Sequence, residues 1–134
     1  MPTKMAKPAL DPGIVTADAG PLLAFYRETF GLEPMDELQI PGIGTIHKLA
    51  CGHSVLRLMV PETPPEPDAA KTWSGRAGFR YLTFEVTDIQ AAVAAARTHG
   101  GQIALEPFEL RPGRFVCQIT DPDGNMLEVG QGNG

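Results

Sequence analysis

Two charged side chains stand at corresponding positions of two short alternating segments. Arg57 lies in the segment 55–60 and Glu128 in the segment 126–130, each on the face opposite to the neighbouring leucines. A carboxylate there can ligate a metal or act as a general base, and a guanidinium can clamp an anionic or carbonyl-bearing ligand. Because an unpaired buried arginine would be very costly, we expect Arg57 and Glu128 to form an ion pair in a shared cleft.

The three histidines are expected in different places. His99 ends the second predicted helix, where a cation suits the helix dipole, so it is expected at the surface. His53 is four residues before Arg57, so in one strand both side chains would lie on the same face, and His53 is placed at the rim of the cleft. A turn made only of Cys51 and Gly52 would point His47 away from that cleft.

Other side chains at the cleft suit ligand binding or proton transfer. Tyr81, Glu85 and Glu128 are the candidates for metal-free acid–base chemistry. The expected ligand-binding residues are Arg57, Met59, Phe79, Tyr81, Met126, Glu128 and His53. Methionine and aromatic side chains adapt to a flat apolar ligand. Trp73 can be a lid, a dimer anchor or a plug within the linker.

The elements that position these residues follow from periodicity and end signals. Two helices are predicted, over 21–30 and 89–99, with Pro21 in the first turn, Gly31 at the exit and Asp88 as N-cap. Alternation predicts strands over 55–60, 79–86 and 126–130, with further strands near 34–40, 43–50, 102–110 and 114–120. The Asp-Pro-Asp-Gly-Asn segment, 121–125, predicts a tight turn between the last two strands.

The order of elements occurs twice. Asp18 matches Asp88, an offset of 70 residues (88 − 18), and Arg27 matches Arg97. Each half is predicted to run strand–helix–strand–strand–strand, over about 12–60 and about 78–131, around a proline-rich linker at about 61–77. We therefore predict one α+β domain over 1–134, in which two paired βαβββ modules form a curved mixed sheet with a central cleft and helices outside.

Composition excludes several classes of function. Of the 134 residues, 43% are hydrophobic and 20% charged, which is typical of a globular chain with its own core. The net charge of -5, without a basic stripe or cluster, argues against nucleic acid and membrane surfaces as partners. No transmembrane stretch or signal peptide is recognisable. Two isolated cysteines, Cys51 and Cys117, indicate reduced thiols in a cytoplasmic protein.

This order of elements, together with Asp121-Pro-Asp-Gly-Asn-Met-Leu-Glu128, resembles the vicinal oxygen chelate superfamily. That superfamily includes glyoxalase I, the bleomycin-resistance proteins, extradiol dioxygenases and methylmalonyl-CoA epimerases. The segment 24–32 resembles the first helix of the family and its exit, and 84–88 resembles the end of the first strand of the second module. The resemblance covers about residues 12–131.

The resemblance also implies where a metal would bind. Metal-using members hold one divalent ion by histidine and glutamate side chains from the first and last strands of both modules. Those positions fall on Asp11, Arg57, Tyr81 and Glu128 in this chain. Only Glu128 matches the pattern well, because a phenol is a poor ligand at neutral pH and a guanidinium cannot ligate.

Two classes of function follow from the resemblance. We expect a protein that binds a small, partly aromatic molecule without a metal or other cofactor, as the drug-sequestering members do. The alternative is a lyase, isomerase or dioxygenase that depends on one divalent metal ion, with Glu128 and Asp11 as ligands and His53 or His47 completing the set. A homodimer is expected in either case.

Overall fold

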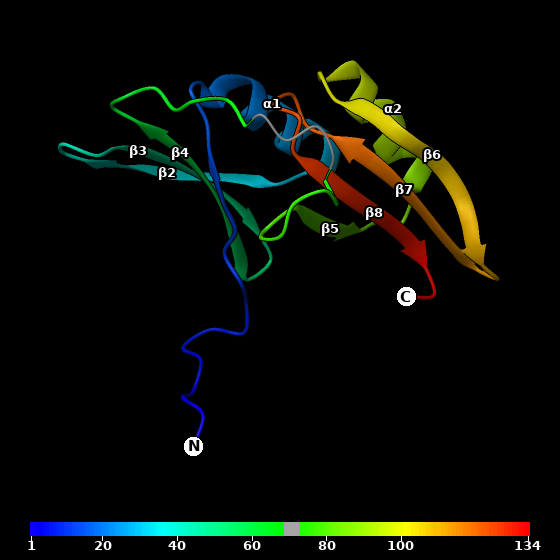
Figure 1. Ribbon diagram of the computed structural model, residues 1–134. Coiled ribbons are helices and arrows are strands. Elements are labelled where there is room, and N and C mark those ends of the chain that lie inside the picture. The colour runs from blue at the N-terminus through cyan, green and yellow to red at the C-terminus, as the bar shows by residue number, and fades with distance from the viewer. Residues whose placement is uncertain (69–72) are drawn as a thin grey trace.

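The computed structural model describes residues 1–68 and 73–134, and its helices and strands form two modules of the same design (Figure 1). The first contains β1 (Gly13–Val15), α1 (Ala19–Phe30), β2 (Glu33–Ile40), β3 (Gly44–Cys51) and β4 (Ser54–Pro61). The second contains β5 (Tyr81–Glu85), α2 (Ile89–Thr98), β6 (Gln102–Arg111), β7 (Arg114–Thr120) and β8 (Met126–Gly132). The predicted order of elements is confirmed.

The two helices begin at aspartate caps. Asp18 is extended and accepts a hydrogen bond from the Gly20 backbone N–H at 3.0 Å, so α1 begins at Ala19, two residues before the predicted start. The helix ends at Gly31, whose φ of 69° is left-handed, as expected. Asp88 caps α2 by accepting from the Ala91 backbone N–H at 3.1 Å.

Each module contributes a four-stranded mixed sheet. The strand orders are β1-β4-β3-β2 and β5-β8-β7-β6, so the first strand of each module pairs in parallel with its last strand and lies at one edge. The other pairings are antiparallel. This arrangement confirms the α+β class with paired βαβββ modules.

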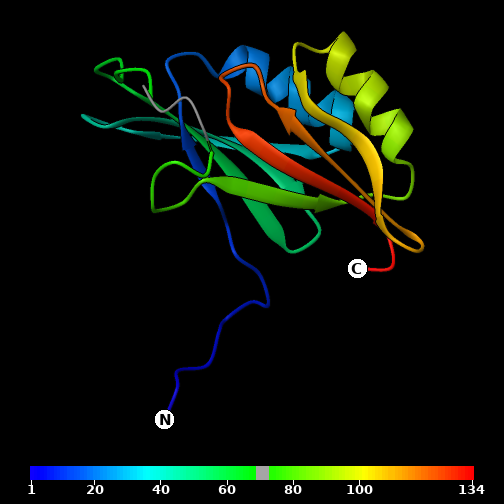
Figure 2. The same cartoon turned by 45° about the vertical axis from the view of Figure 1, so that its right-hand side comes forward.

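The helices cover one face of each sheet and contact each other at the centre of the molecule (Figures 1 and 2). Leu56 and Leu58 of β4 and Leu127 and Val129 of β8 face this shared core and are buried. The opposite face of each sheet has no helix on it, and we call it the open face. It carries Arg57 and Met59 in module one, and Tyr81, Thr83, Met126 and Glu128 in module two.

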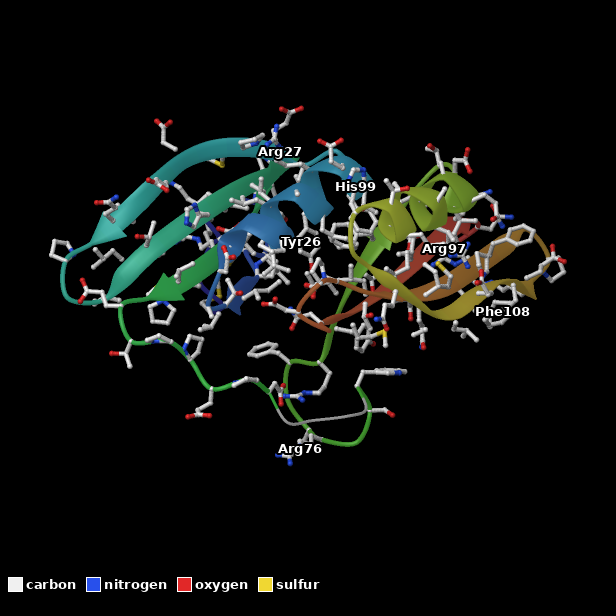
Figure 3. All side chains as sticks on the ribbon, turned by 90° about the horizontal axis from the view of Figure 1, so that it is seen from above. Tyr26, Arg27, Arg76, Arg97, His99 and Phe108 are labelled. Carbon is white, nitrogen blue, oxygen red and sulfur yellow. The ribbon has the colours of Figure 1, made fainter. Side chains whose placement is uncertain are left out.

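One buried hydrogen bond joins the modules. Tyr26 of α1 is fully buried, and its hydroxyl donates to the Asp121 carboxylate at 2.7 Å. Asp121 begins the predicted turn between β7 and β8 and also accepts from the backbone N–H groups of Asp123 and Asn125, each at 2.9 Å. Figure 3 shows Tyr26 on α1 at the junction of the two modules.

The segment before β5 differs in part from the prediction. The strand begins at Tyr81 rather than at 79, and Phe79 precedes it with its side chain fully exposed. Four residues of the predicted linker, 69–72, lie outside the described part of the chain.

Neither helix is long and apolar enough to cross a membrane.

Replacing Tyr26 by Phe should lower the free energy of unfolding more than the loss of an exposed tyrosine hydroxyl does. The change removes a donor from a buried carboxylate, for which we expect a cost of about 2 kcal/mol in the free energy of unfolding. Tyr81→Phe, which removes an exposed hydroxyl from the open face, is the matched control and should change stability by less than about 0.5 kcal/mol. Urea denaturation of both variants measures the difference, and equal stabilities would contradict the role of Tyr26.

Candidate functional site

Three of the predicted site residues, Tyr81, Met126 and Glu128, come together on the open face of module two. Tyr81 is the register partner of Met126, and Thr83 is the partner of Glu128, so these side chains form two adjacent rows across β5 and β8. Glu128 is half-buried, and Gln118 of β7 flanks it on the other side. The Glu128 carboxylate therefore lies between Thr83 and Gln118 at the centre of this face.

An arginine that the sequence analysis did not select organises the same face. Arg114 of β7 is 7% exposed and donates through both terminal nitrogens to the Glu85 carboxylate, with Nη2 to Oε2 at 2.9 Å. The guanidinium lies against Gly130, where a Cβ atom would come within 2.2 Å of Nη2. A larger residue at position 130 would therefore displace the guanidinium from its present place.

The pair fixes the charge state of both partners. Hydrogen bonds from Arg114 hold the pKa of Glu85 below its usual range, and burial opposes this effect only in part. The Glu85 carboxylate raises the pKa of Arg114, and the charge of Glu128 adds to that increase. Glu85 is thus a weak base that is already occupied, which argues against its predicted role in proton transfer.

A cavity of about 370 Å³ opens on this face. Its walls combine apolar side chains of β6 and β7 with the polar groups around Glu128. The lining residues are Leu105, Phe108, Leu110, Arg111, Arg114, Val116, Cys117, Gln118, Glu128 and Gly134. Figure 3 places Phe108 on β6, at the end of module two far from Tyr26. Cavities of this kind bind small molecules that have an apolar body and one polar group.

Module one presents a cationic open face. Arg57 is exposed and lies beside Lys48 of β3, and Met59 lies beside Ile46 and Val15. The expected ion pair between Arg57 and Glu128 needs correction, because no such pair is present in the described ranges 1–68 and 73–134. Arg114 takes the neighbouring carboxylate of Glu85 instead, and Arg57 stays available on the other sheet.

The remaining predicted metal ligands are separated from Glu128. Asp11 forms an ion pair with Lys7 at 2.7 Å and accepts from the Val55 backbone N–H at 2.9 Å, and both hydrogen bonds lower its pKa. His53 is exposed in the turn between β3 and β4. His47 pairs in register with Leu58 on the helix side, as the parity predicted, and lies 3.2 Å from Glu37.

The donor set therefore does not fit a metal centre of the family type. Arg57 and Tyr81 replace two ligands, and the Asp11 carboxylate is already bound by Lys7. In the part of the chain that the structure describes, no group of three His, Cys, Asp or Glu side chains gathers around one point. Without a metal, the Glu128 carboxylate can accept a hydrogen bond or a proton from a bound molecule.

Two of the residues that sequence reasoning missed, Arg114 and Gln118, could have been found from the register of the strands. Gln118 and Arg114 follow from extending the hairpin register through the turn at 121–125, since positions 114, 116, 118 and 120 alternate toward the open face. Phe108 was harder to place, because the pairing of β6 with β7 is interrupted by irregularities that change which side chains share a face.

The family follows from a match over most of the chain. The family model described as the glyoxalase/bleomycin resistance protein/dioxygenase superfamily matches residues 9–129. The chain therefore belongs to that superfamily.

Individual relatives are more distant. The uncharacterized protein YaeR of Escherichia coli is 38% identical over 72 residues, which are 52% of this chain and 48% of that protein, so the chain matches about half the length of this curated relative. A glyoxalase family protein from Bacillus cereus has a TM-score of 0.79 at 22% identity, over 98% of this chain and 100% of that one. Lactoylglutathione lyase from Agrobacterium tumefaciens has a TM-score of 0.61 at 24% identity, over 96% of each chain. These structures show that the fold is shared.

The pair of Glu85 and Arg114 should make stability depend on acid pH. The pKa of Glu85 is lowered in the folded chain, so the pair stabilises fully above the usual glutamate pKa of about 4.3 and loses its effect as the pH falls through the lowered value. Glu85→Gln should cost about 1 kcal/mol at pH 7, a modest figure because the carboxylate is half-exposed. The difference from the unchanged chain should shrink toward pH 3.

The control is Glu106→Gln, which removes an exposed ion pair with Arg97. It should change the unfolding free energy by less than about 0.5 kcal/mol at either pH. Urea denaturation at pH 7 and pH 3 provides the comparison. If Glu85→Gln lowers the free energy of unfolding by the same amount at pH 7 and at pH 3, the role given to this pair is wrong.

Proposed function

We propose that this protein binds a small, partly aromatic molecule at its open faces without a bound metal, as a sequestering or resistance protein does. The observation that carries the proposal is the replacement of metal ligands: Arg57 and Tyr81 stand at two of the four family positions, and Asp11 at a third is held by Lys7. Arg114 forms its hydrogen bonds with Glu85, while its charge also interacts with Glu128, so Glu128 is an acceptor beside a cation on this face.

The side chains suit a planar ligand with one polar group. Tyr81 and Met126 provide adjacent faces for an aromatic ring, and Met59 and Phe79 add apolar surface. Arg57 would anchor a carbonyl or anionic group, and Glu128 would accept from a donor. His53, exposed in its turn, lies at the rim of module one.

A second copy of the chain is the proposed protein partner. Both open faces keep large apolar side chains exposed, including Val15, Leu38, Tyr81 and Phe108 at 40–60%. Exposed apolar area of this kind usually marks an interaction surface. The cytoplasm is the proposed compartment, because Cys51 and Cys117 are free cysteines, as is usual in a reducing environment.

The first test of the proposed function is a thermal-shift panel on the full chain. Planar aromatic compounds should raise the melting temperature, whereas sugars and inorganic phosphate should not. Met126→Ala, which removes a ligand-facing side chain, should reduce the shift, while Ile43→Ala, an exposed apolar residue in the turn between β2 and β3, should not. Stabilisation by phosphate or sugars alone would reject the proposal.

Metal content is the second test and decides between the two classes of function. A divalent ion at Glu128 would find one carboxylate as ligand, and the positive charge of Arg114, which interacts with that carboxylate, would oppose its binding. We expect far less than one Ni, Zn, Mn or Fe per chain in untagged protein, and no change in melting temperature with EDTA.

The converse of the metal test is to restore the ligands. Arg57→Glu combined with Tyr81→His adds two donors at the family positions and should increase metal binding over the unchanged chain. About one metal per chain in the unchanged protein, lost in Glu128→Ala, would reject the binding protein and support the metal-dependent lyase, isomerase or dioxygenase.

The proposed dimer has its own measurement. Light scattering at high micromolar concentration should give twice the chain mass of 14.3 kDa. Val15→Asp, which places a charge on the exposed edge strand β1, should shift the mass toward that of one chain. A single-chain mass for the unchanged protein at that concentration would reject the homodimer.

A further inference from the structure

The segment that leads into β5 brings a tryptophan onto the open face of module two. Trp73 is the only tryptophan of the chain, and its ring lies against that of Tyr81, with centroids 5.2 Å apart and planes at 80°. Trp73 is 36% exposed although it belongs to no helix or strand, so most of the indole is covered. The contact therefore fixes the indole beside a predicted ligand-binding residue.

A third aromatic residue, Phe79, lies two residues before Tyr81. The three aromatic residues fall within nine positions (73–81), and Phe79 is fully exposed while Tyr81 is 52% exposed. Arg80, which stands between Phe79 and Tyr81 in the chain, forms an ion pair with Asp68 at 3.8 Å and so ties the residue before β5 to the middle of the linker. We call Trp73, Phe79 and Tyr81 the aromatic corner.

The corner keeps aromatic surface exposed for another ring. With the edge-to-face contact in place, Tyr81 is still 52% exposed and Trp73 36% exposed, so both residues retain solvent-facing surface. Tyr81 lies beside Met126, and Glu128 follows in the next row of the same open face. A ring bound at the corner would therefore reach the polar centre of the face with its substituent.

We propose that Trp73 is a specificity-determining residue of the ligand site, and that the aromatic corner binds the planar ring of the ligand. This inference rests on the proposed function and adds a residue from outside the two sheets. Stacking against two rings favours aromatic over saturated rings of the same size, because only the aromatic ring has a flat face and a matching quadrupole. The ligand class is thus a planar aromatic compound with a hydrogen-bonding substituent.

The single tryptophan makes the inference measurable without knowing the natural ligand. The probe is 4-nitrobenzyl alcohol, whose nitroaromatic ring quenches indole fluorescence on contact. Cyclohexylmethanol is the matched control, since it has the same alcohol on a saturated ring. We expect saturable quenching of Trp73 by the first compound, and no competition by the second.

Variants separate contact with the ligand from a structural role. Trp73→Leu and Tyr81→Leu should each weaken binding of the probe about fivefold in calorimetry, as expected for the loss of one aromatic contact. Trp73→Phe and Tyr81→Phe keep a ring and should retain most of the affinity. Ile43→Ala, far from the corner in sequence and on module one, should bind the probe like the unchanged chain, and urea denaturation checks that all variants fold.

Three outcomes would overturn the inference. If calorimetry shows probe binding that neither quenches Trp73 nor weakens in Trp73→Leu, the ligand lies elsewhere and the proposed function stands. If neither the probe nor any aromatic compound of the thermal-shift panel binds, the proposed function fails as well. If Trp73 emission instead changes with protein concentration in the absence of probe, and Phe79→Ser abolishes that change, the corner is an interface between copies.

Discussion

The hydrogen bond from Tyr26 to Asp121 is the constraint on which the arrangement of both modules depends. A buried carboxylate is costly unless its oxygens are satisfied, and Asp121 accepts from the Tyr26 hydroxyl and from the backbone and side chain of Asn125. Burial raises the pKa of Asp121, while these hydrogen bonds act in the opposite direction. One set of contacts therefore holds α1 of the first module against the turn that starts β8 of the second.

The consequence for the site is direct. Because the turn is fixed, the register of β7 and β8 is fixed, and Gln118 pairs with Glu128 while Thr120 pairs with Met126. Close packing supports the same junction, since a Cβ atom on Gly101 would come within 2.5 Å of the Phe25 ring of α1. The core thus determines which side chains the open face presents, although none of the core residues lies on that face.

An ion pair within the chain gives module two a polar centre that needs no metal. Arg114 lies against Gly130 and binds Glu85, and its charge also interacts with the Glu128 carboxylate. In the metal-using members that this chain resembles, a divalent ion supplies the positive charge at this face. Here a permanently charged guanidinium supplies it, and its planar fork holds one carboxylate in a fixed orientation. This arrangement is one reason why we propose selective binding rather than Lewis-acid chemistry.

Most of the fold was predictable because its signals are local. The Asp88 cap, Gly31 and the alternation of β4, β5 and β8 each depend on a few neighbouring residues, and all of them appear in the structure, whereas the Asp18 cap was missed and α1 begins two residues early. The position of His47 followed from strand parity alone. The partners of charged residues were not predictable in this way, because they depend on which strands are adjacent and on irregular pairing. Arg57 was therefore assigned to Glu128, while Arg114 and its contact with Glu85 were missed.

The central claim is that Glu128 lies on a face built for a ligand without a metal. Titration of ¹⁵N-labelled protein with Mn²⁺, followed by NMR, tests it most directly, because a bound paramagnetic ion broadens the signals of nearby amides. We predict weak, non-saturable broadening spread over exposed acidic residues, with the amides of Tyr81 and Glu128 no more affected than the rest. Selective loss of the Tyr81 and Glu128 signals at about one equivalent of Mn²⁺ would contradict the account.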